Sequence, residues 1–175
     1  YLFNFSRNLS YYLRNKGKDN HLNNPFSLLW GTMFIQNLKA LLLRKYLEKT
    51  YISENQLSDM KYVFFPLHTE PEVSLMVRAP QCLNQIEVIR NIARSLPAHL
   101  SLLVKEHPVA IGKRSLGFYK KILDIPNVKL MSPQIKAQTA IKHSTLVTTI
   151  NSSIGQDAIL LGKPVICFGD VSYQI

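Results

Sequence analysis

The sequence predicts an α/β domain with a mainly parallel sheet and helices on both faces, and two patterns in residues 61–175 support this. Short runs of β-branched or aromatic residues predict strands, and they alternate with longer stretches that favour helices. The predicted strands cover residues 62–66, 101–104, 128–131, 145–149 and 165–168, and the predicted helices cover residues 84–96, 115–123, 135–142 and 154–161. This alternation is typical of a Rossmann-like fold, in which ligand-binding loops follow the carboxyl ends of the strands.

Residues 1–60 differ from the rest because they are rich in Leu, Asn, Tyr and Phe and lack short strand-like runs. They predict a helical N-terminal segment or linker, with one long helix over residues 26–49, Asn23 or Asn24 as its cap and Pro25 in its first turn. The chain begins at Tyr1 rather than Met and stops at Ile175, just after a predicted strand. We therefore expect a fragment of a longer protein, truncated within its second domain.

The predicted helix over residues 26–49 does not predict a membrane span, because its apolar stretch ends after about ten residues, far short of a roughly 30 Å hydrocarbon core. Its Trp30 and its later basic residues would suit a helix lying on an anionic membrane surface. An amphipathic helix packed on its own protein is the alternative, and the pattern favours it.

The amino-acid composition and net charge indicate which classes of partner to expect. The 175 residues are 46% hydrophobic, which is enough for one globular core, and the net charge of +10 favours anionic partners. No zinc-finger or RNA-binding signature is present, so nucleic acid is not an expected partner. Cys82 and Cys167 are far apart and lack metal-ligand spacing, which fits a reducing cytoplasm.

The first candidate binding motif is Lys105-Glu106-His107-Pro108, directly after a predicted strand. This position places His107 at the ligand edge of the sheet, where an imidazole could donate a hydrogen bond to a phosphate oxygen. Lys105 is a second candidate for the same phosphate. A structural turn is the alternative.

The second motif is the segment 149–155, a strand end that leads through Ser152 and Ser153 to Gly155 and an apolar helix. Serines at a helix start, together with the N–H groups of the first turn, predict an anion site. Asp157 follows, and its carboxylate could accept hydrogen bonds from a ribose or sugar hydroxyl. Simple helix capping is the alternative.

The third motif, residues 66–72, again follows a predicted strand and carries two carboxylates, Glu70 and Glu72. They could orient a hydroxyl or act as a base, and a solvated polar loop is the alternative. Residues 162–164 predict only a turn. Phosphate-loop, dinucleotide and nucleophile-elbow motifs are absent from the sequence, which argues against the common NTPase, dinucleotide-binding and hydrolase classes.

Taken in order, PLHTEPE (66–72), KEHP (105–108) and NSSIGQDAILLGKPVICFG (151–169) resemble bacterial capsule and surface-polysaccharide glycosyltransferases related to the capsular Kdo transferases. The resemblance covers residues 61–173. It implies the carboxyl-terminal, donor-binding half of a GT-B enzyme, in which His107, Ser152 and Ser153 bind the phosphate of a nucleotide sugar such as a CMP-Kdo-like donor. It also implies that the loop with Glu70 and Glu72 faces an interdomain cleft.

The resemblance further implies a glycan or glycolipid acceptor and a place in the cytoplasm, with a possible contact on the inner face of the membrane. No DxD-like pair is evident, so no metal or other cofactor is expected. The runner-up family is the CDP-glycerol glycerophosphotransferases, which usually carry Asp-Tyr where this chain has Ile150-Asn151. From another class, a non-catalytic basic module that binds anionic membrane or glycan is the competing hypothesis.

Overall fold

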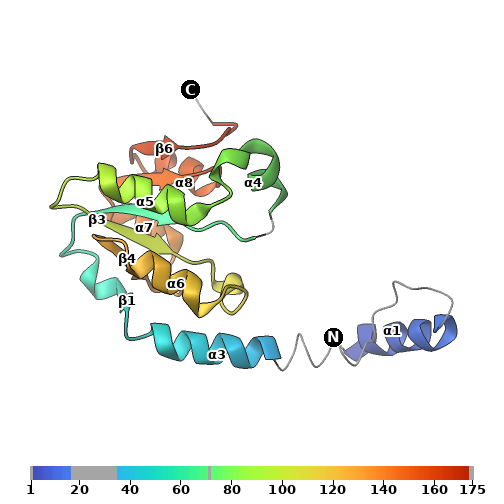
Figure 1. The fold of residues 1–175 in the computed structure, drawn as a ribbon. Helices are drawn as coiled ribbons and strands as arrows, with labels where there is room; N and C mark the ends of the chain where they lie inside the picture. Colours follow the sequence, from blue (N-terminus) through green and yellow to red (C-terminus); the bar gives the residue numbers. More distant parts are fainter. Residues whose placement is uncertain (1, 17–34, 71, 174–175) are drawn as a thin grey trace.

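The computed structural model describes residues 2–16, 35–70 and 72–173, and its central feature is a parallel sheet (Figure 1). Within these residues six strands form one sheet in the order β1-β4-β3-β2-β5-β6, and all neighbouring strands are parallel. The strands are β1 (Tyr51–Ile52), β2 (Tyr62–Pro66), β3 (Ser101–Lys105), β4 (Val128–Met131), β5 (Leu146–Thr149) and β6 (Val165–Cys167). The predicted Rossmann-like α/β fold is therefore confirmed.

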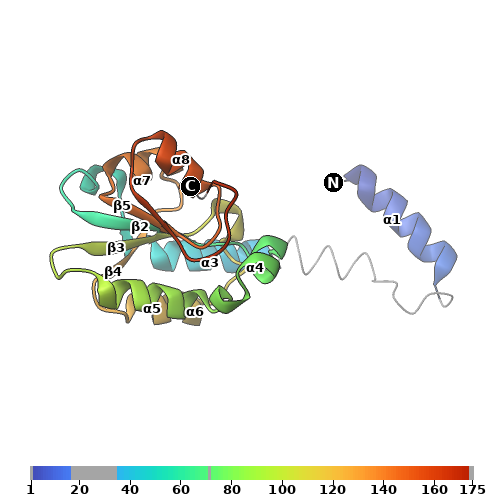
Figure 2. The same cartoon turned by 90° about the horizontal axis from the view of Figure 1, so that it is seen from above.

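Helices cover both faces of the sheet, as predicted. Figure 2 shows α5 and α6 on one side of the strands and α7 and α8 on the other. The helices are α1 (Leu2–Asn15), α3 (Gln36–Leu47), α4 (Val73–Arg78), α5 (Gln85–Ser95), α6 (Leu116–Leu123), α7 (Ala137–His143) and α8 (Ile154–Leu160). Short 3-10 turns lie at Glu54–Gln56, Pro80–Cys82 and Pro108–Ala110.

The central strand β2 is buried over its whole length, which explains why its sequence is continuously apolar. Its side chains alternate between the two faces. Val63 and Phe65 join the core cluster under α5 and α6, whereas Tyr62 and Phe64 join the cluster under α7 and α8. The Tyr62 hydroxyl donates a hydrogen bond of 2.7 Å to the carbonyl of Ala140, which fixes α7 to the sheet.

The order of the strands reverses at β2. From β2 the chain adds β3 and β4 on one side, and it then crosses to the other side to form β5 and β6. The loops that follow β2 and β5 therefore start from adjacent strands and leave in opposite directions. In open parallel sheets this reversal of strand order is where ligands bind.

The expectation of a helical segment over residues 1–60 was incomplete, because β1 lies within it. A strand of two residues is too short to show an alternating pattern, so this strand could not be predicted from periodicity. Helix α3 matches the second part of the helix predicted over residues 26–49, and residues 17–34 lie outside the described residues. None of the described helices has both the length and the hydrophobicity needed to cross a membrane.

Helix α3 is attached to the domain through its buried face. Leu43 and Leu47 belong to the core cluster that also holds α5 and α6. Leu47 is fully buried, whereas Leu42 on the same helix is 62% exposed.

We predict that Leu47→Ala lowers the free energy of unfolding by about 2 to 5 kcal/mol, because it removes buried methyl groups and leaves a cavity. Leu42→Ala is the matched control, and it should change the free energy by less than about 0.5 kcal/mol. Urea unfolding followed by circular dichroism measures both. Equal effects of the two substitutions would contradict the packing of α3 on the sheet.

Candidate functional site

Loops that follow β3, β4 and β5 surround a cavity of about 490 Å³ at the carboxyl edge of the sheet. Its lining comes from three segments: Lys105, His107 and Pro108 after β3, residues 133–138 after β4, and Ser152, Ser153 and Ile154 after β5. The predicted imidazole and the predicted pair of hydroxyls, more than forty residues apart in the sequence, thus line the same cavity.

The lining is positively charged. It contains Lys105, Lys136 and His107, and none of the described residues that line it is an Asp or a Glu. Lys105 is only 8% exposed, and burial lowers the pKa of its ammonium group while the neighbouring Glu106 opposes that shift. An anion bound in the cavity would favour the charged form of Lys105. The arrangement therefore suits a phosphate or carboxylate group.

Lys136 is a lining residue that the sequence analysis missed. It stands at the N-cap position of α7 and is exposed. Because it follows the end of the third predicted strand, the rule that placed His107 at the ligand edge could also have selected it.

The paired serines have different roles at the start of α8. Ser153 occupies the N-cap position but has helical backbone angles and makes no capping hydrogen bond. Ser152 Oγ instead accepts a hydrogen bond of 3.2 Å from the N–H of Ile154. Since α8 has only seven residues, its dipole is a minor contribution, and side chains have to supply most of the attraction for an anion.

Gly155 and Asp157 are not among the described residues that line the cavity. Gly155 is buried against Tyr173, and a Cβ atom at this position would lie 2.2 Å from the Tyr173 hydroxyl. That hydroxyl donates a hydrogen bond of 2.6 Å to the carbonyl of Ser152. Glycine is therefore needed here so that Tyr173 can reach the turn, and Asp157 lies half-buried in the first turn of α8.

Glu70 and Glu72 lie in the loop after β2, and each has a partner within the protein. Glu70 Oε1 accepts hydrogen bonds from Gln85 and, at 3.2 Å, from Arg114. Glu72 Oε2 lies 3.1 Å from His68 Nδ1. Their side chains are 43% and 37% exposed, respectively, and neither is among the described residues that line the cavity, so their catalytic role stays a prediction.

Glu106 does not face the cavity, although it lies between two residues that do. Its carboxylate is 2% exposed and accepts hydrogen bonds from Arg114 Nη1 at 2.7 Å, the Tyr119 hydroxyl at 2.9 Å and the His107 N–H at 2.9 Å. Arg114 also donates to the carbonyl of His68, and its guanidinium lies 4.5 Å from the centre of the Phe118 ring. This buried cluster ties the loop after β2 to the loop after β3.

His68 is the other residue whose role sequence reasoning missed. It is 4% exposed, and its backbone N–H and carbonyl both bond to the side chain of Gln85, at 2.9 and 3.2 Å. Neither the apolar sequence of β2 nor the polar sequence of the loop after it indicates that this histidine is buried.

Across residues 2–16, 35–70 and 72–173, no three His, Cys, Asp or Glu side chains gather in a way that could hold a metal ion.

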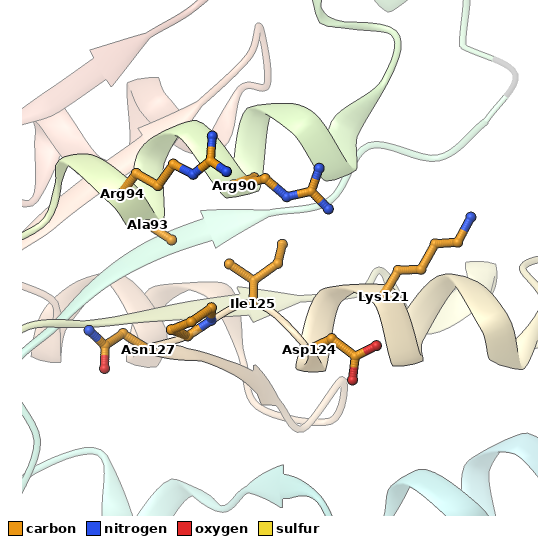
Figure 3. Close-up of a pocket in the computed structure, with 8 residues that line it drawn as sticks. Arg90, Ala93, Arg94, Lys121, Asp124, Ile125 and Asn127 are labelled. Carbon is orange, nitrogen blue, oxygen red and sulfur yellow. The ribbon is translucent and has the colours of Figure 1, made fainter.

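A second hollow, of about 320 Å³, lies between α5 and α6 (Figure 3). Arg90, Arg94 and Lys121 line it together with Asp124. Residues 124–127 lead into β4, so this hollow is near the amino ends of the strands, away from the cavity described above. Arg94 and Lys121 stand in the last turns of their helices, where the carbonyl ends favour cations. Helix electrostatics therefore favour two of the three cations there, Arg94 and Lys121.

Comparison with known proteins decides the family. Residues 5–175 match the family described as capsule polysaccharide biosynthesis protein. The chain belongs to this family. The resemblance to capsule polysaccharide enzymes is therefore confirmed.

Several relatives of this chain are much longer than it is. It is 31% identical over 121 residues to protein FixF of Sinorhizobium fredii, covering 65% of the chain and 28% of FixF. It is 22% identical over 139 residues to the capsule polysaccharide modification protein LipA of Neisseria meningitidis, covering 74% of the chain and 20% of LipA.

Solved structures show the same fold. The structure of Thermosulfurimonas dismutans KpsC, a beta Kdo 2,7 transferase, superposes with a TM-score of 0.53 at 18% sequence identity. The match covers 83% of this chain and 46% of that one. The chain thus spans less than half of the related structure and about a quarter of its curated relatives.

We predict that Glu106→Gln lowers the free energy of unfolding by about 3 to 5 kcal/mol, because it removes the buried carboxylate that pairs with Arg114 and leaves that guanidinium only its longer contact with the partly exposed Glu70. Glu87→Gln is the control, since it removes a carboxylate from the exposed pair with Arg90 and should cost at most about 1 kcal/mol. Chemical denaturation of both variants gives the comparison. Similar stabilities of the two variants would show that the Glu106 cluster does not hold the loops.

Proposed function

We propose that this chain is the donor-binding part of a GT-B glycosyltransferase that binds a nucleotide-activated sugar for capsule or surface-polysaccharide synthesis. The observation that carries the proposal is the shared cavity, in which His107, Ser152 and Ser153 meet Lys105 and Lys136. Two lysines, an imidazole and two hydroxyls with no carboxylate among the described lining residues fit a phosphate group better than a neutral ligand. Membership of the capsule polysaccharide biosynthesis family supports the same conclusion.

In the proposed reaction, the main task of the protein is to stabilise negative charge on the leaving nucleotide. When the bond between sugar and phosphate breaks, the nucleotide leaves as an anion, and donors fixed in advance around its phosphate stabilise the developing charge. His107 and the serine hydroxyls would donate hydrogen bonds, while Lys105 and Lys136 would supply positive charge. In this proposal the protein's own cations neutralise the phosphate, and no metal ion is needed.

The acceptor side of the reaction is assigned to the loop after β2. Glu70 and Glu72 are partly exposed there, and either could orient a glycan or glycolipid hydroxyl or accept its proton. Glu70 is the more constrained of the two because Gln85 and Arg114 both contact it.

A glycerophosphotransferase that uses CDP-glycerol remains the second candidate. The same cavity would hold its phosphates. The identity of the nucleotide that binds, and of the group attached to it, separates the two candidates.

We predict that His107→Ala weakens nucleotide binding by about 1 to 3 kcal/mol, because it removes a hydrogen bond to a charged phosphate. His99→Ala is the control, since His99 is exposed and precedes the same strand at its amino end. Calorimetric titration with CMP, UDP and CDP measures the affinities. Unchanged affinity in His107→Ala would remove this residue from the site.

Helix α3 carries the observation that favours contact with a membrane. Its outer face exposes Leu38, Leu41, Leu42 and Tyr46, all at least 52% accessible. Lys45 and Lys49 line a hollow of about 490 Å³ with Leu42 and Tyr46 on this face. Apolar side chains among cations suit an anionic lipid surface, and this would place the enzyme on the inner face of the cytoplasmic membrane.

We predict that the chain sediments with vesicles containing anionic phosphatidylserine and that binding weakens strongly as salt rises, because surface attraction between charges is screened. Leu41→Glu combined with Leu42→Glu should abolish sedimentation, while neutral phosphatidylcholine vesicles serve as the control. Nucleotide binding without vesicle binding would support the transferase and reject the membrane contact. Vesicle binding without nucleotide binding would instead favour a non-catalytic basic module.

A further inference from the structure

The buried ring of His68 connects the two loops at the reversal of strand order. On one side, Nδ1 lies 3.1 Å from Glu72 Oε2. On the other, Nε2 lies 3.5 Å from the backbone nitrogen of Asn151, whose N–H donates to it, in the turn after β5. Gln85 holds the backbone of the same residue at two points. Glu72 and Asn151 therefore hold the ring, while Gln85 holds the backbone that carries it.

These contacts define which ring nitrogen carries the proton. A backbone N–H is always a donor, so Nε2 has to accept from Asn151 with its lone pair. The proton of the neutral ring then lies on Nδ1, where it donates to the carboxylate of Glu72. A carboxylate that orients an imidazole in this way fixes both the tautomer and the direction of the ring.

The bond from Asn151 acts on the turn that carries the paired serines. Asn151 directly precedes Ser152, whose N–H donates to Thr149 Oγ1 at 3.3 Å and whose carbonyl accepts from Tyr173 at 2.6 Å. The side chains of His68, Thr149 and Tyr173 thus all hold the backbone of this turn. Of these three, His68 belongs to the loop after β2.

We propose that His68 is a positioning residue of the phosphate site: its ring, oriented by Glu72, holds the Asn151 backbone so that Ser152 and Ser153 face the cavity. The inference rests on the proposed function, because it assigns the serine turn to phosphate binding. His68 itself touches no ligand in this proposal. It acts only through the backbone of the turn.

Two amide substitutions test the hydrogen-bond acceptor at Nε2 separately from the rest of the ring: one keeps an acceptor at that position and the other does not. In His68→Gln the longer side chain can place its amide oxygen near the position of Nε2 and accept from Asn151. In His68→Asn the shorter side chain reaches only the position of Nδ1, so the Asn151 N–H loses its acceptor. Both side chains are neutral and polar, which makes the pair a matched comparison, and His99→Asn controls for loss of an exposed imidazole.

We expect His68→Asn to weaken CMP or UDP binding about fivefold to tenfold, the equivalent of one hydrogen bond, and His68→Gln to restore most of it. Cytidine and uridine lack the phosphate, so the affinity measured for them should change less. Hydrogen exchange of the Asn151 amide, followed by NMR without ligand, should be faster in His68→Asn and close to wild type in His68→Gln.

The possible outcomes are distinguishable. If the wild-type chain binds no nucleotide, the proposed function fails, and the Asn151 exchange rate still tests the contact with His68. If nucleotides bind and His68→Asn changes neither affinity nor exchange, the positioning role is rejected while the proposed function stands. Should His68→Asn not fold, Glu72→Ala is the second variant. It removes the carboxylate that orients the ring, and the Glu72 side chain is 37% exposed. Unchanged nucleotide affinity and Asn151 exchange in this variant would equally reject the role.

Discussion

The arrangement of the candidate site depends on one buried carboxylate. Glu106 accepts hydrogen bonds from Arg114, Tyr119 and the backbone of His107, and it is almost inaccessible to water. A buried charge of this kind is tolerated only when it is fully paired. The pairing fixes where the loop after β3 leaves the sheet, and through Arg114 it also fixes the carbonyl of His68 in the loop after β2.

The same carboxylate explains the order of residues in the Lys-Glu-His-Pro motif. Side chains at a strand end alternate between the two faces of a sheet, so Lys105 and His107 line the cavity while Glu106 lies between them on the opposite face. Alternation thus separates two functions within three consecutive residues. The outer two contribute positive and hydrogen-bonding groups to the cavity, and the middle residue anchors the loop.

The sequence was sufficient for most of the fold because buried parallel strands have a strong signature. Strands β2 to β6 are short apolar runs bounded by turns, and their bounds were predicted to within one residue. Strand β1 and helix α4 were missed because two and six residues are too few to show a period.

The site was predictable only in part. The strand-end rule selected His107, Ser152 and Ser153, and it would have selected Lys136 if applied to the loop after β4. The internal partners of Glu70 and Glu72, and the burial of His68, depend on Arg114 and Gln85, which are distant in the sequence. Spacing along the chain carries no information on such contacts.

The edge position of β1 has a consequence for how the domain assembles. Among the strands that the structure describes, β1 pairs with β4 alone, so Tyr51 meets Leu130 across a loop of almost eighty residues. Closing so long a loop is entropically costly before the intervening strands have formed. Strands β2, β3 and β4 therefore have to be in place first, and we expect α3 and β1 to dock last and to detach first when the protein begins to unfold.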